Sequence, residues 1–162
     1  MQEHTSHTAE PLLELTVDRV VEDPNTDTRI LVLSRTDGRT ELFTIWIGAA
    51  EGESIRRALD TSVTPRPMSH DLIKSFGEHF GVKTERVVLT DVKSSTYFAT
   101  VYLESNGVTR AIDARPSDAI ALALRCQAPI YVTQDVWDRR SGQNLDAWLS
   151  KLATKNIGTQ EV

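Results

Sequence analysis

The stretch from Ala111 to Arg125 constrains the fold more than any other part of this sequence. It has the pattern of a strand end, a short polar corner, and then a helix that is almost wholly apolar after its first turn. A helix that is apolar on most sides has to be buried, so this element predicts the centre of a packed core. Pro116 suits the first helical position, where its missing N–H costs nothing. Ser117 or Asp113 can supply the oxygen that caps the free amides at the helix start.

Charged side chains gather at two such corners, each just before a helix. The first corner carries Asp113, Arg115 and Asp118, and the second, residues 66–71, carries Arg66, Ser69, His70 and Asp71, with Ser69 as the expected N-cap. A helix start with free amides and an arginine alongside can bind an anion such as phosphate. Carboxylates that converge with a histidine can also hold a hard divalent cation. The same acids stand where ordinary capping or dipole-matched acids would, so a purely structural corner remains the alternative.

Hairpins with helices between them dominate the rest of the pattern. Alternating apolar and polar residues predict strands at 12–21, 29–34, 40–47, 86–92, 97–104, 108–113 and 129–133. Asp-Gly at 37–38 and Asn-Gly at 106–107 predict hairpin turns. Helices are expected at 49–60, from 69 to a C-cap at Gly81, after Pro116, and at about 145–154. This order indicates an α+β fold, with a mostly antiparallel or mixed sheet and about three to four helices packed on it.

A single domain accounts for most of the 162 residues. We expect residues 1–10 to be a disordered tail, because they lack the apolar region of a secretory signal. Residues 11–140 should form the domain, and residues 141–162 a C-terminal amphipathic helix and tail. No apolar run is long enough to span a membrane, and a single cysteine makes the cytoplasm the default location. The net charge of -5 disfavours tight nonspecific nucleic-acid binding but does not exclude a local basic cleft.

Other candidate residues have ordinary structural explanations. We expect Glu51 and Glu53 on a solvated helix surface and Cys126 as a small core residue at a buried helix end. The tryptophans are expected as core or interface anchors, not as base-stacking platforms: Trp46, Trp137 and Trp148. The sequence has no HExxH, CxxC, Walker, GxGxxG or GxSxG motif.

Three segments resemble the bifunctional nuclease family, formerly catalogued as a domain of unknown function. They are Ile45-Trp46-Ile47-Gly48 with Glu51 and Ile55, Arg66-Pro67-Met68-Ser69-His70-Asp71-Leu72, and Ile112-Asp113-Ala114-Arg115-Pro116-Ser117-Asp118-Ala119-Ile120-Ala121-Leu122-Ala123. The third segment is highly specific, and the resemblance covers residues 13–140. The chain departs from the family at Ser69, where members often have Thr, and at Gly52, where they often have Ala. Neither change puts the fold in doubt.

The resemblance implies a compact α+β domain, often dimeric, that acts on RNA and DNA. For this chain it leads to the hypothesis of a nuclease-like phosphodiesterase that uses Mg²⁺ or Mn²⁺. The candidate catalytic residues are His70, Asp113, Arg115 and Asp118, with Asp113 and Asp118 as metal ligands. The candidate substrate-binding residues are Arg66, Ser69 and Asp71.

These roles follow from residue chemistry. Arg115 would stabilise charge on the phosphoryl oxygens, and His70 would act as general acid or base, since histidine titrates near neutral pH. The hypothesis requires both corners to lie side by side. The alternative is a non-enzymatic regulatory or small-anion-binding dimer, in which Arg115 pairs across the corner and the corner is structural.

Overall fold

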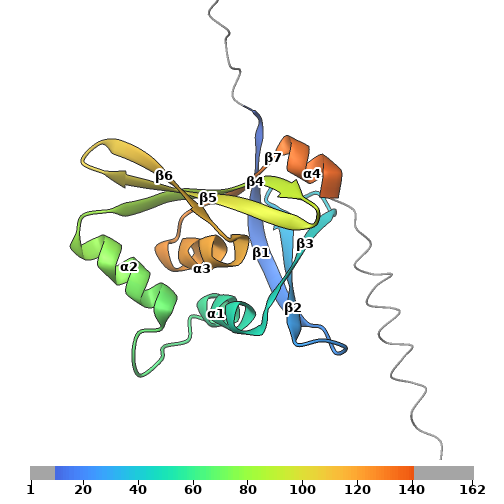
Figure 1. The fold of residues 1–162 in the computed structure, drawn as a ribbon, viewed down its shortest axis with the longest axis horizontal. Coiled ribbons are helices and arrows are strands. Elements are labelled where there is room, and N and C mark those ends of the chain that lie inside the picture. Colours follow the sequence, from blue (N-terminus) through green and yellow to red (C-terminus); the bar gives the residue numbers. More distant parts are fainter. Residues whose placement is uncertain (1–9, 141–162) are drawn as a thin grey trace, which may run out of the picture.

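The computed structural model describes residues 10–140, and Figure 1 shows their arrangement. The strands are β1 (Leu12–Glu22), β2 (Thr28–Arg35), β3 (Leu42–Gly48), β4 (Lys83–Lys93), β5 (Thr96–Ser105), β6 (Val108–Ala114) and β7 (Ile130–Thr133). The helices are α1 (Ala49–Leu59), α2 (Ser69–His79), α3 (Pro116–Cys126) and α4 (Gln134–Arg140). The expected helix at about 145–154 and Trp148 lie outside the described residues.

All seven strands form one sheet in the order β3-β2-β1-β7-β4-β5-β6. Every neighbouring pair is antiparallel except β4 and β7, which are parallel. The hairpin turns predicted from Asp-Gly and Asn-Gly are present: Gly38, Asn106 and Gly107 have positive φ angles of 81°, 52° and 77°. The α+β class with a mixed sheet is therefore confirmed.

Three helices, α1, α2 and α3, pack on the same side of the sheet (Figure 1), and α3 is the innermost of them. As predicted, α3 is buried, with Ile120 fully inaccessible to solvent. It packs against β4 and β5 while α1 and α2 contact its other sides. Gly52 lets α1 lie close to β2, because a Cβ there would come within 2.8 Å of the Arg29 side chain. The polar corner before α3 is thus held by the core.

The short helix α4 was not expected from the sequence. It packs against β4 and β7, and its Trp137 is buried and stacks on Phe43 with ring centroids 5.9 Å apart. Trp137 is therefore a core anchor, as predicted. Trp46 differs, since 46% of it is exposed. On β3 its side chain alternates with the buried Ile45 and Ile47 and so faces away from the core.

Two capping predictions were wrong. Met68, not Ser69, is the N-cap of α2, and its N–H donates to the Asp71 carboxylate at 2.9 Å. At α3, Pro116 does occupy the first position, but the N-cap is Arg115 and no side chain caps the helix. Neither Ser117 nor Asp113 supplies a capping oxygen, so the start of α3 keeps free backbone donors.

No helix among residues 10–140 is long and apolar enough to cross a membrane.

Candidate functional site

The two polar corners meet. His70, in the first turn of α2, and Asp118, in the first turn of α3, lie 48 positions apart in the chain, yet His70 Nε2 is 3.0 Å from Asp118 Oδ1. The packing of α2 against α3 produces this contact. Their side chains are 12% and 34% exposed, so the pair lies at the boundary between protein and solvent. The juxtaposition that the hypothesis required is therefore present.

Arg115 joins this pair to α1. Its Nε donates to Asp118 Oδ2 at 2.7 Å, and a terminal guanidinium nitrogen lies 3.1 Å from Glu51 Oε1. The Arg115 side chain is 66% exposed, whereas that of Glu51 is only 21% exposed. Glu51 was expected on a solvated surface; the structure instead places it beside the corner, in contact with the arginine. Arg115 thus presents cationic charge to solvent from a fixed position.

Ser54 completes the group from the opposite side of the imidazole. Its Oγ lies 2.8 Å from His70 Nδ1. An ionised Asp118 can only accept a hydrogen bond, so Nε2 carries a proton. In the neutral imidazole, Nδ1 then accepts from the Ser54 hydroxyl. We call the residues joined in this way the polar cluster: Glu51, Ser54, His70, Arg115 and Asp118.

The charges of the cluster are stabilised by one another. Burial by itself raises the pKa of Asp118, but hydrogen bonds from Arg115 and His70 outweigh it and leave that pKa below its usual value. The hydrogen bond to Asp118 raises the pKa of Arg115. At neutral pH the corner therefore holds a carboxylate and a guanidinium in direct contact.

A second ion pair lies directly behind the cluster. Arg125 Nε donates to Asp71 Oδ1 at 2.6 Å, and its terminal nitrogens donate to the carbonyls of Ala121 and Ser54 at 2.9 and 3.2 Å. Only 8% of the Arg125 side chain is exposed. The hydrogen bond from Arg125 lowers the pKa of Asp71. Arg125 therefore links α1, α2 and α3. Asp71, which was predicted to bind substrate, instead forms an ion pair with Arg125.

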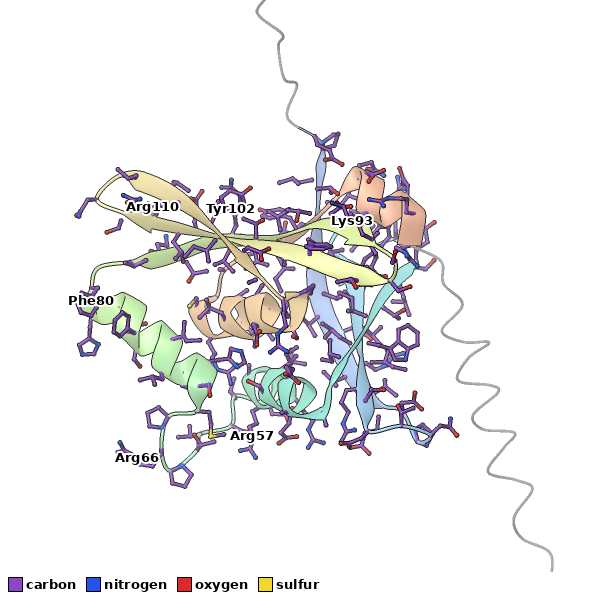
Figure 2. All side chains as sticks on the ribbon, in the orientation of Figure 1. Arg57, Arg66, Phe80, Lys93, Tyr102 and Arg110 are labelled. Carbon is purple, nitrogen blue, oxygen red and sulfur yellow. The ribbon has the colours of Figure 1, made fainter. Side chains whose placement is uncertain are left out.

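An open cleft with a volume of about 860 Å³ borders the cluster. His70 and Asp118 lie on its wall, and the rest of the lining is largely apolar, from α2, α3 and the sheet. Members of this lining include Ile73, Phe76, Phe80, Leu103, Ile112 and Leu122. Figure 2 shows Phe80 at the end of α2, toward the outer edge of the molecule. A ligand in this cleft would reach the imidazole and the carboxylate.

Four predicted site residues do not join the cluster. Asp71 pairs with Arg125 behind it. Asp113 is exposed on β6, and because Ile112 and Ala114 line the cleft, alternation directs Asp113 to the opposite face of the sheet. Arg66 lies in the loop between α1 and α2 and extends outward there (Figure 2). Ser69 is exposed at the start of α2.

The acids of the first corner do not fit a shared metal ion. Asp113 and Asp118 lie on different faces, and both oxygens of Asp118 already accept hydrogen bonds from cations or imidazole. Across residues 10–140, no group of three His, Cys, Asp or Glu side chains is arranged to hold an ion. Metal dependence stays a prediction.

Sequence reasoning missed Glu51, Ser54 and Arg125 as members of this region. One signal was available for the first two: they are three positions apart, so on a helix they share a face. Arg125 ends the apolar run of α3, where a basic residue is expected for the helix dipole alone. Its role depends on the neighbouring helices.

Comparison with known proteins identifies the same family that the three sequence segments resemble. Residues 31–144 match the sequence model of the family described as the bifunctional nuclease domain. An uncharacterized protein of Mycobacterium tuberculosis is 35% identical over 107 residues, which cover 66% of this chain and 63% of that protein.

Two plant proteins are also similar. Bifunctional nuclease 1 of Oryza sativa subsp. indica is 30% identical over 109 residues, covering 65% of this chain and 33% of the plant protein. Bifunctional nuclease 2 of Arabidopsis thaliana is 30% identical over 107 residues, covering 64% and 32%. The chain thus spans less than two thirds of the mycobacterial relative and about a third of the plant relatives.

Proposed function

This chain belongs to the bifunctional nuclease domain family, and from that membership we propose that it hydrolyses phosphodiester bonds of RNA or DNA at the polar cluster. The observation that carries the proposal is the meeting of the two corners: His70 and Asp118 in contact at 3.0 Å, with Arg115 at 2.7 Å, on the rim of an open cleft. Family membership supports nuclease-like chemistry in general. The residue roles below are our own assignment.

Arg115 is the group that would bind the scissile phosphate. Its side chain is 66% exposed and is oriented by Asp118 and Glu51. Guanidinium recognises two phosphate oxygens at once and stabilises the charge that develops on them in the transition state. The free backbone donors at the start of α3 lie next to it and favour the same charge.

The His70–Asp118 pair would handle the proton. In hydrolysis, water attacks phosphorus, the bond to the leaving oxygen breaks, and one water proton ends on that oxygen. Imidazole can take and return this proton near neutral pH. Asp118 would hold the ring in the Nε2–H tautomer and stabilise the imidazolium. In this tautomer Nδ1 is the basic atom, and the Ser54 hydroxyl that donates to it would pass it the proton taken from water and later return that proton toward the leaving oxygen.

The test is cleavage of single-stranded RNA and DNA by purified Asp118→Asn and Arg115→Ala variants, with and without EDTA. We expect each variant to lose activity by about a hundredfold or more. Asp91→Asn is the matched control, because Asp91 also pairs with an arginine, Arg139, but lies away from the cluster on β4. Undiminished cleavage by the folded cluster variants would overturn the proposal. Loss of wild-type activity in EDTA would establish metal dependence.

A second candidate function is supported by the saturation of the cluster. Both oxygens of Asp118 and both ring nitrogens of His70 already have partners. Such a network suits a regulatory or small-anion-binding domain in which the corner is structural. The salt dependence of oligonucleotide binding separates the two candidates. A slope near zero means few phosphate contacts and favours the regulatory domain.

We further propose that the protein works as a homodimer in the cytoplasm. The dimer is supported by the apolar residues exposed on α2 and at its end, among them Leu72, Phe76 and Phe80 at 61%, 65% and 68%. The cytoplasm is supported by the lone Cys126, which has no partner for an internal disulfide.

A further inference from the structure

One edge of the sheet, at β6, is open to solvent. β6 pairs with β5 on one side and has no strand on the other within residues 10–140 (Figure 1). Six of its seven residues are exposed, whereas four of the seven residues of β3, the opposite edge strand, are buried. β6 also lacks proline, lysine and a bulge, which commonly keep an open edge from pairing with another chain. A further strand can therefore join the sheet at β6.

The hairpin determines which backbone groups of β6 point outward. Asn106 and Gly107 form a two-residue turn with positive φ angles, so the flanking residues Ser105 and Val108 exchange hydrogen bonds. Alternate residues after Val108 then bond to β5 in the same way. The N–H and C=O groups of the residues between them point away from the sheet: Thr109, Ala111 and Asp113. These six groups have no backbone partner within the described residues.

This spacing makes the edge complementary to a second copy of itself. A second β6 running antiparallel matches all six groups only in the register that places Ala111 opposite Ala111 of the partner subunit, because any shift leaves outward groups unmatched. This register also places Thr109 opposite Asp113 of the partner subunit, so no two like charges lie directly opposite each other. A shift by two residues toward the turn would place Arg110 opposite Arg110 of the partner subunit.

The apolar side chains of β6 favour the same pairing. Val108 and Ile112 are 53% and 50% exposed, and alternation puts both on the face that lines the cleft. In the self-paired register, Val108 lies opposite Ala114 of the partner subunit and diagonal to Ile112 of the partner subunit. The two-fold axis is perpendicular to the sheet, so both clefts and both α2 helices lie on the same side of it. The apolar surfaces of the two copies therefore gather on that side.

We propose that two copies of the chain join at β6, antiparallel about Ala111, so that their two seven-stranded sheets become one continuous sheet. The inference rests on the proposed homodimer and adds the surface through which it forms. Each cleft also gains a side chain from the other copy, because Arg110 of the partner subunit lies opposite Ile112 on the cleft side. Arg110 is exposed and forms no ion pair with another described residue, so its charge is available to an anionic ligand.

The first test is a disulfide across the two-fold axis. Antiparallel residues that exchange hydrogen bonds have Cα atoms about 5.5 Å apart, which a disulfide can span. Ala111→Cys in a Cys126→Ser background, which removes the one native thiol, should therefore give a linked dimer on mild oxidation, measured by non-reducing electrophoresis. Thr109→Cys in the same background is the matched control. It is exposed on the same edge, but its two copies would be offset by about 14 Å along the strands and should stay unlinked.

The second test is Ala111→Pro, which removes the central donor of the proposed pairing. The substitution costs the protomer no hydrogen bond, because this N–H points away from β5. We expect the dimer dissociation constant to rise by about a hundredfold in sedimentation equilibrium. Ala111→Ser, which keeps the N–H, should remain dimeric.

Three results would overturn pairing through β6 while leaving the homodimer intact: wild-type dimer affinity in folded Ala111→Pro, no linked dimer from Ala111→Cys, or equal linking of the two cysteine variants. A monomeric wild-type protein would overturn both the pairing and the homodimer. Cleavage by Asp118→Asn, measured separately, tests the catalytic assignment independently of these results.

Discussion

Asp118 is the residue on which the candidate site depends most directly. Its two carboxylate oxygens accept from different partners, His70 through Oδ1 and Arg115 through Oδ2. One side chain thus orients both the imidazole and the guanidinium. Its pKa is lowered because these hydrogen bonds outweigh the effect of burial, and the ionised form is the one that the fold stabilises.

This lowered pKa predicts how stability depends on pH. Since the folded-state pKa lies below the unfolded value of 3.8, the carboxylate stabilises the fold above about pH 4. That contribution is lost as pH falls through the folded-state pKa. In urea unfolding, Asp118→Asn should therefore be less stable than wild type by about 1 kcal/mol at pH 7, with a smaller difference below pH 4. Asp113→Asn, outside the cluster, should show little difference at either pH. A loss in Asp118→Asn that does not change with pH would contradict this origin.

At the scale of elements, α2 is held mainly through its first turn. No residue of α2 is buried, and the helix reaches the rest of the molecule largely through α3. His70 and Asp71 make the polar contacts at this end, to Asp118 and to Arg125. At the other end Gly81, with a φ of 66°, completes the turn after the helix, and the Val82 N–H donates to the Gly77 carbonyl.

Arg125→Met should therefore destabilise the protein by about 2–4 kcal/mol, because it leaves the Asp71 carboxylate without its buried guanidinium partner and removes the hydrogen bonds that join α3 to α1 and α2. Urea unfolding measures the loss, and hydrogen exchange should show faster opening of α2 than of β4. Arg139→Met is the control. Arg139 also pairs with two acids, Asp91 and Asp135, but its side chain is 42% exposed, so less than about 1 kcal/mol should be lost. Equal losses of unfolding free energy in the two variants would contradict the role of Arg125 in holding α2 against α3.

At the scale of the whole molecule, apolar surface is concentrated on one side. Leu72, Ile73 and Phe76 of α2 and Phe80 directly after it are all more than half exposed, and Ile112 of β6 is 50% exposed. Several of these side chains line the cleft. Apolar surface gathered in this way favours association, and a second copy of the chain would cover it in the proposed dimer.

Phe76→Glu tests this arrangement. A carboxylate in the middle of the apolar face would lose its hydration on association, so we expect the variant to be monomeric while wild type sediments as a dimer. Sedimentation equilibrium measures the difference. Phe98→Glu, an exposed aromatic position on β5, should leave the dimer intact. A monomeric wild-type protein, or a dimeric Phe76→Glu variant, would contradict the assignment of the interface to α2.

The sequence by itself determined the strands and all but one of the helices that the structure describes. The period of apolar residues located the strands and the three larger helices, Gly107 and Gly38 marked two hairpins, and the apolar run after Pro116 identified the buried helix, because these signals are local. The position of α4 was missed, since its seven residues follow β7 without a break and give no clear period. The site residues were found only as two separate corners.

Tertiary structure alone decided which of these residues meet. Packing of α1 and α2 on α3 brought His70 to Asp118, brought Glu51 and Ser54 in beside them, and left Asp113 on the opposite face of the sheet. The pattern of neighbouring residues in the sequence does not predict such contacts, because they join positions up to 71 residues apart, as between Arg125 and Ser54. A charged residue at a helix start gives the same sequence pattern whether it caps the helix, forms an ion pair or binds a ligand. Only its neighbours in space distinguish these roles.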